Sequence, residues 1–153
     1  MRRMGEKGWR GDRGTLSLFV VIFTPTVLLL AGLLVDGGIA INARERAADV
    51  AEQAARAGAN DLNVAALRQG SVKLAGTACA VATAFVPKYA GIGATPGPRP
   101  CSIRSVNGQQ VIRVYATVTV HSQLLSIIGI NTFTESAYGE ASPVCGITQG
   151  GQC

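Results

Sequence analysis

The sequence has little of the chemistry that most enzymes and metal proteins need. It contains one histidine, His121, and it has no glycine-rich phosphate loop, GxSxG motif or HExxH motif. The C-terminal carboxylates Glu135 and Glu140 are five residues apart in an expected strand, so they face opposite sides of the sheet. We therefore expect no enzyme activity, no cofactor and no metal site, with His121 an ordinary residue at a strand end.

Aromatic residues are also scarce, at 5% of the chain, although the net charge is +5. A net positive charge is typical of proteins that bind nucleic acid. After residue 61, however, the basic residues are scattered and are not interleaved with aromatic ones. The sequence therefore predicts that nucleic acid is not a partner.

Charge is absent from the 21 residues Thr15 to Val35, TLSLFVVIFTPTVLLLAGLLV. A helix of this length measures about 32 Å, which matches the hydrocarbon thickness of a lipid bilayer. The segment is therefore predicted to span a membrane. Pro25 lies within it between two threonines, and we expect a kink there, with the threonine hydroxyls satisfying freed carbonyl groups.

The charges around this segment predict its direction. Residues 1–14 carry five basic and two acidic residues, a net charge of +3, just before the span. Basic residues at this place hold the N-terminus in the cytoplasm, so the chain from Asp36 onward is expected outside. A secretory signal peptide cut near Gly38 or Ala40 is the alternative, although its apolar core is about 7–15 residues long.

The helical pattern continues beyond Asp36, which is expected to mark the exit from the membrane. Alanine dominates residues 36–61, and one narrow apolar stripe recurs at steps of three and four: Ile39, Ala43, Ala47, Val50, Ala54 and Ala57. The stripe fits a helix that packs on its own domain and equally one that packs on copies of itself. Gly37 and Gly38 are the places where a long helix from Thr15 to Ala59 could be interrupted.

All four cysteines follow the span and are therefore expected on the oxidising side: Cys79, Cys101, Cys145 and Cys153. Their spacing matches no zinc motif, so disulfides are favoured. Four cysteines allow three pairings. Sequence order favours Cys79–Cys101 with Cys145–Cys153, since both close short loops.

The remaining residues, 62–153, predict a small α+β domain. A second helix is expected between Leu62 and Tyr89, in one or two pieces, with an apolar face of Leu74, Ala78, Val81, Ala82 and Phe85. Pro87 and Gly91 end it, and residues 91–100 form a Gly/Pro linker.

Three antiparallel strands follow, over 102–106, 110–120 and 132–141. The first two are joined at the Asn107-Gly108 turn, and a short apolar connector with a helical turn covers 124–130. The fold class is thus α+β: a long N-terminal transmembrane helix, a second helix and a three-stranded sheet. The predicted division is a leader (1–14), a span (15–35), a helical extension (36–61) and an exterior disulfide-bonded domain (62–153).

The chain resembles the TadE/TadG-like proteins of tight-adherence (Flp) pilus systems. The most specific part is the junction of Arg13-Gly14, the apolar span, Val35-Asp36-Gly37-Gly38 and RERAADVAEQAARAGA. The segments VIRVYATVTV, LLSIIGI and FTESAYGEASPV are also similar to that family. The resemblance implies a minor pilin-like, non-enzymatic protein in pilus assembly, adhesion or surface attachment, with other pilin-like subunits, a secretion ATPase and platform proteins as partners.

The resemblance also implies processing by a prepilin peptidase after Gly14, which would make Thr15 the new N-terminus. Processed members of the family usually carry glutamate five residues after the cleaved glycine, and this chain has Phe19 at that position. The sequence thus leaves open a cleaved pilin-like subunit and a protein that stays anchored in the membrane. A stand-alone, membrane-anchored binding module outside the cell is the alternative function.

Overall fold

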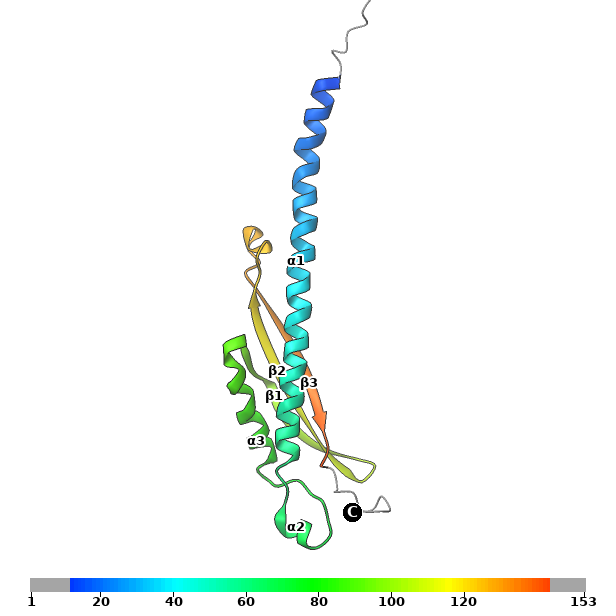
Figure 1. The fold of residues 1–153 in the computed structure, drawn as a ribbon, viewed down its shortest axis with the longest axis vertical. Coiled ribbons are helices and arrows are strands. Elements are labelled where there is room, and N and C mark those ends of the chain that lie inside the picture. Colours follow the sequence, from blue (N-terminus) through cyan, green and yellow to red (C-terminus); the bar gives the residue numbers. More distant parts are fainter. Residues whose placement is uncertain (1–11, 144–153) are drawn as a thin grey trace, which may run out of the picture.

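The computed structural model describes residues 12–143 of the chain, and Figure 1 shows their arrangement. The elements follow in the order α1 (Asp12–Ala59), α2 (Val64–Arg68), α3 (Ala78–Phe85), the 3-10 segment η1 (Val86–Ile92), β1 (Ala94–Val106), β2 (Gln109–His121), the 3-10 segment η2 (Leu125–Ile128) and β3 (Thr132–Ala141). The α+β fold class predicted from the sequence, with its long helix, second helix and three-stranded antiparallel sheet, is confirmed.

Helix α1 is a single helix of 48 residues, about 72 Å long. Gly37 and Gly38 do not interrupt it, although a glycine in a helix interior costs about 1 kcal/mol relative to alanine. Just beyond them, the Asn42 side chain donates to the Gly38 carbonyl at 3.0 Å. Further along, Arg56 pairs with Glu52 one turn earlier at 3.3 Å.

The C-terminal half of α1 is packed against the rest of the chain, whereas most of the N-terminal half stands free (Figure 1). The packed half buries Ala43, Ala47, Val50 and Ala54 of the predicted stripe, together with Ala51, Ala55 and Ala59. These residues face β2, β3 and α3. Of the two packing partners that the sequence left open, the stripe therefore packs on the protein's own domain.

The sheet has the order β1-β2-β3 with both neighbouring pairs antiparallel. Asn107 and Gly108, with φ of 53° and 81°, form the predicted two-residue turn between β1 and β2. Strand β2 alternates as expected, since Ile112, Val114, Ala116 and Val118 are fully buried against the helices. The bounds of β3 are those predicted from the sequence, Thr132–Ala141.

Strand β1 begins at Ala94, eight residues before the predicted start, so the prediction of a linker over 91–100 was wrong for residues 94–100. Ala94, Thr95 and Pro96 pair with β2, the register then shifts, and pairing resumes at Cys101. Prolines cannot donate to a neighbouring strand, but β1 is an edge strand, where such residues are tolerated. The proline-rich composition therefore concealed a strand.

The second helix is also shorter and more broken than one continuous helix over 62–89. Gly70, with φ of 74°, follows α2, and α3 ends at Phe85, two residues before Pro87. The 3-10 segment η1 then continues past Gly91 to Ile92 and is capped by Gly93. Leu74, Ala78 and Ala82 are buried as predicted, but Val81 is 42% exposed because it lies on the outer side of α3.

Two glycines let the packed elements approach closely. Gly139 of β3 lies directly against the backbone of Ala51 and Glu52, where an added Cβ would overlap main-chain atoms. Gly58 of α1 lies against Ile112, Ala78 and Ala82. Small residues of α1 therefore let its backbone lie close to β3 and α3, with the larger core side chains such as Ile112 and Val114 coming mainly from β2.

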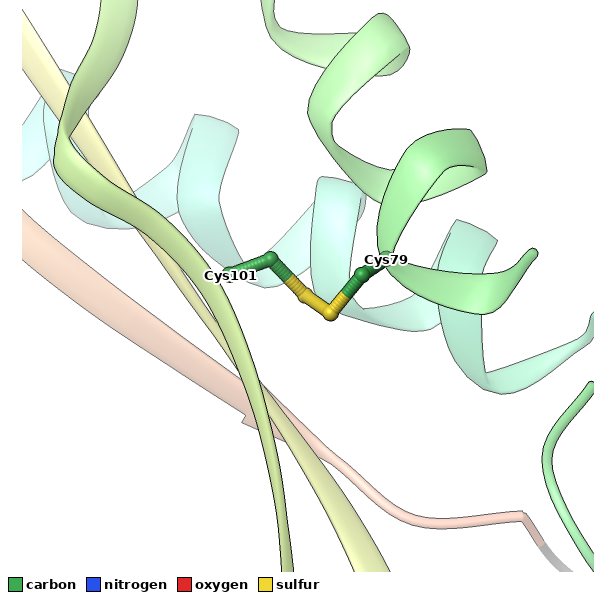
Figure 2. The surroundings of a disulfide bond; sticks show 2 residues. All are labelled: Cys79 and Cys101. Carbon is green, nitrogen blue, oxygen red and sulfur yellow. A yellow bond between two sulfur atoms is a disulfide. The ribbon is translucent and has the colours of Figure 1, made fainter. Parts of the chain in front are cut away.

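A disulfide between Cys79 and Cys101 joins α3 to the edge strand β1, with a Cα–Cα distance of 5.5 Å (Figure 2). This predicted pairing is confirmed. The bond closes a loop with a sequence separation of 22, which stabilises the fold by about 3 kcal/mol in the chain-entropy model. Cys145 and Cys153 lie outside the described residues, and their pairing stays a prediction.

The contact of Gly139 with the helix backbone yields a prediction. We expect Gly139→Ala to lower the free energy of unfolding by more than about 2 kcal/mol, because neither backbone can move aside cheaply. Thermal unfolding of the detergent-solubilised chain, followed by circular dichroism, measures this.

Gly76→Ala is the matched control, since no atom lies within 4 Å of its added Cβ. It should change the free energy of unfolding by less than about 0.5 kcal/mol. Equal melting temperatures for the two variants would contradict the close packing of β3 on α1.

Candidate functional site

The free half of α1 is an exposed apolar rod. Its large side chains are mostly 50–80% exposed, among them Leu16 at 70%, Phe19 at 62% and Leu34 at 80%. Among the described residues, α1 is the one helix long and apolar enough to cross a membrane, with a mean hydropathy of 2.7 over its most apolar part. Exposed apolar surface of this extent is stable in lipid or against other protein, but not in water.

The features predicted inside this rod lie as follows. Helix α1 runs on through Pro25, and the Thr26 hydroxyl donates to the Ile22 carbonyl at 3.1 Å. The carbonyl that Pro25 leaves without its helical donor is that of Val21, so the expected threonine contacts to freed carbonyls stay a prediction. The kink at Pro25 stays a prediction. Phe19 stacks on Phe23 with ring centroids 5.2 Å apart. The position where the family's processed members carry glutamate is thus part of an exposed aromatic pair.

Arg13, Gly14 and Thr15 lie in the first turn of α1, which begins at Asp12. The expected processing site between Gly14 and Thr15 is therefore at the very start of the helix. Cleavage there would leave almost the whole helix in place.

Asp36 ties the far end of the sheet to α1 at the end of its free half. Its carboxylate is completely buried. It accepts hydrogen bonds from three successive backbone N–H groups, those of Gln123 at 2.8 Å, Leu124 at 3.0 Å and Leu125 at 2.6 Å. The expected role of Asp36 as the membrane exit stays a prediction. The contact with a segment 87 positions away adds a structural role.

The segment that Asp36 holds is the connection between β2 and β3, residues 122–131, which we call the hairpin tip. Much of its backbone is hydrogen-bonded within the tip. The Ser122 N–H donates to the Asn131 carbonyl, and Ile127, Gly129 and Ile130 donate to carbonyls of the tip itself. The Ser122 hydroxyl donates to the Ile130 carbonyl. The predicted helical turn is present as η2, and Gly129 ends it with φ of 91°.

The hairpin tip packs on α1 within the apolar rod. A Cβ added at Gly32 would meet the Leu124 Cβ at 3.2 Å, so only a small residue allows this approach. Beside this contact, towards the N-terminus of α1, the tip and the helix border a groove of about 410 Å³. It is lined by Pro25, Leu28, Leu29, Ala31, Gly32, Leu124, Leu125, Ile127 and Ile128. The groove has no charged lining residue, so it offers space for apolar ligands or side chains only.

The partner of Asp36 was not predicted from the sequence. The signals were present separately: one acid directly after 21 uncharged residues, and an apolar connector, LLSIIGI, between two polar strand ends. Nothing in their spacing links residue 36 to residues 123–125. Strands β2 and β3 lie along α1 (Figure 1). The connection between them thereby reaches α1, where Asp36 accepts its N–H groups.

Charged groups elsewhere form ion pairs on the outer face of the sheet. Glu140 accepts hydrogen bonds from Arg113 and Arg104, and the bond from Arg113 above all lowers the pKa of Glu140 from its ordinary 4.5. His121 is exposed at the end of β2. Within residues 12–143, no three side chains of the His, Cys, Asp and Glu types are grouped so that they could hold a metal ion.

Residues 14–61 match the model of the Tad family, described as "Putative Flp pilus-assembly TadE/G-like". The matched segment is nearly all of α1, including the apolar rod, Asp36 and the alanine stripe. The resemblance drawn from the sequence is confirmed over this segment. No curated protein and no solved structure matches the chain.

The Asp36 contact yields a second prediction. In Asp36→Ala the N–H groups of Gln123, Leu124 and Leu125 lose their acceptor. We expect their amide hydrogen exchange to accelerate at least about tenfold, the factor that a hydrogen bond to a charged group is worth. Hydrogen exchange of the full chain in lipid nanodiscs, read by mass spectrometry of peptides, measures this.

Asp49→Ala serves as control, because Asp49 is an exposed acid on the same helix. In this control variant, the peptide that covers residues 122–131 should exchange at the wild-type rate. If Asp36→Ala and Asp49→Ala gave the same exchange in that peptide, Asp36 would not hold the hairpin tip.

Proposed function

We propose, from the match of residues 14–61 to the Tad family, that the chain is a membrane-anchored, non-enzymatic, minor pilin-like protein of a tight-adherence pilus or related secretion system. It contributes to adhesion or surface attachment. Its partners are the bilayer, other pilin-like subunits and the platform proteins of the assembly machinery. The observation that carries the proposal is the exposed apolar rod of α1, which continues directly into the helix that forms the core of the exterior domain.

The orientation follows from charge. Residues 1–14 carry a net charge of +3, and the first acidic residue after them is Asp36. This asymmetry keeps the N-terminus in the cytoplasm and the sheet outside. The Cys79–Cys101 disulfide supports this side for the domain, since disulfides persist in oxidising compartments.

One structural feature suits assembly into a bundle of helices. The rod keeps no contact with its own domain over its first turns, so lipid or neighbouring helices can surround it on all sides. An apolar helix moves from lipid into a protein bundle without exposing a charge, because residues 15–35 contain none. Phe19 suits both surroundings. The rod is therefore apolar and continuous with Phe19 at the position where processed relatives carry glutamate.

We propose further that a prepilin peptidase cuts between Gly14 and Thr15. Co-expression with such a peptidase, followed by intact-mass measurement of the membrane-extracted protein, tests this step. We expect a chain that lacks residues 1–14 and begins at Thr15. In Gly14→Val the bulky residue should block the cut, whereas Gly11→Val, three residues earlier, should be cut normally.

Three outcomes of that measurement are distinct. A Thr15 N-terminus that disappears only in Gly14→Val supports the processed pilin-like protein. An intact leader in the wild-type chain contradicts processing and leaves a permanently anchored component. A new N-terminus near Ala40 contradicts the anchor itself and indicates a secreted domain released from a signal peptide.

A further inference from the structure

We propose that the hairpin tip, residues 122–131, inserts its apolar end into the outer hydrocarbon layer of the bilayer, beside the rod of α1. The chain would then contact the membrane core at two places rather than one. The inference rests on the proposed membrane anchoring, and its test separates the two.

The first support is the surface of the tip. Its ten residues, SQLLSIIGIN, include no charged residue. Ile127 is 83% exposed, Ile128 59%, and Leu124 and Ile130 42% each. Four large aliphatic side chains thus gather at the end of one hairpin, where a water-facing loop would carry polar residues.

The second support is the level of the tip along α1. Leu124 packs on Gly32, which lies within the predicted span, and the groove beside the tip extends to Pro25. From Asp36 to Pro25 the helix advances about 16 Å, half of the roughly 30 Å hydrocarbon thickness. If residues 25–32 lie in hydrocarbon, the segment that packs against them lies there too.

The third support is how the backbone of the tip is satisfied. Irregular backbone survives in lipid only where its polar groups find partners within the protein. Asp36 accepts from three consecutive N–H groups of the tip, and turn hydrogen bonds within the tip take up four more, those of Ser122, Ile127, Gly129 and Ile130. The Ser126 hydroxyl donates to the Gln123 carbonyl at 3.1 Å. The buried carboxylate therefore satisfies backbone N–H groups of the tip, as intrahelical hydrogen bonds satisfy those of a membrane-spanning helix.

These observations favour lipid over a second protein chain as the partner that covers the hairpin tip. The apolar surface of the tip is continuous with that of the rod, and no charged residue lies on the groove between them. The groove, with a volume of about 410 Å³, is large enough to hold part of an acyl chain. The bilayer that covers the rod reaches this surface without a further partner.

Tryptophan quenching by lipids with brominated acyl chains tests the inference on the full chain in phosphatidylcholine vesicles. The chain has one tryptophan, Trp9, so Trp9→Phe provides a silent background. Ile127→Trp is placed on it, with Leu29→Trp reporting the rod and Val106→Trp reporting the opposite end of the sheet. All three sites are exposed, at 83%, 57% and 44%, so the variants should fold.

We expect Ile127→Trp to emit at shorter wavelength and to be quenched by brominated lipid nearly as strongly as Leu29→Trp, with Val106→Trp unquenched. Ile128→Trp should repeat the result of Ile127→Trp. Quenching of Leu29→Trp without that of the two tip variants would overturn the inference and leave the anchor intact. A shifted but unquenched Ile127→Trp would also overturn it, because protein rather than lipid would cover the tip.

An unquenched Leu29→Trp would contradict the membrane anchoring itself. The failure of the proposed function and the failure of the inference are therefore distinguishable in one set of samples.

Discussion

The buried carboxylate of Asp36 is the interaction on which the arrangement of this molecule depends. It lies at the point of α1 where the exposed apolar rod ends and the packed half begins. By accepting three backbone N–H groups, it fixes the far end of a long two-stranded hairpin to the helix. A buried charge is costly unless it is fully hydrogen-bonded, so this contact is stable only when helix and hairpin are correctly aligned.

That alignment also requires the small residues further along α1. Alanines at three of the predicted stripe positions, Ala43, Ala47 and Ala54, and Gly139 on β3 let the sheet lie directly on the helix. With larger residues at these positions the sheet would lie further from α1, and the hairpin tip could not reach Asp36 or Gly32. The stripe of small residues thus serves packing within the chain, and it leaves most of the rod exposed.

Local patterns made much of this fold predictable. The alternation of Thr132–Ala141 predicted β3, the Asn107-Gly108 pair predicted the turn, and the uncharged run predicted the rod. Predictions were wrong where tertiary context overrides local preference. Prolines 96, 98 and 100 concealed the start of β1, which tolerates them because it is an edge strand. Val81 fitted the helical pattern but lies on the solvent side of α3.

The role of Asp36 was the least predictable part of the candidate site, because its partners are main-chain groups. Backbone N–H groups carry no sequence signature, and any residue other than proline at positions 123–125 could donate in the same way. A further local indication is a small residue one turn earlier, Gly32, and its importance is evident only in the structure, where Leu124 packs on it. Contacts between a side chain and a distant backbone are thus beyond pattern analysis of one sequence.

Disulfide cross-linking of Gly32→Cys with Leu124→Cys in membranes tests the docking of the hairpin tip on α1 most directly. A Cβ added at Gly32 would lie 3.2 Å from the Leu124 Cβ, close to the spacing of about 3.5–4.5 Å that disulfides adopt. The account predicts spontaneous formation of this bond, found as a linked peptide by mass spectrometry, and no bond between Gly38→Cys and Leu124→Cys. Equal yields for the two pairs, or none for either, would contradict it.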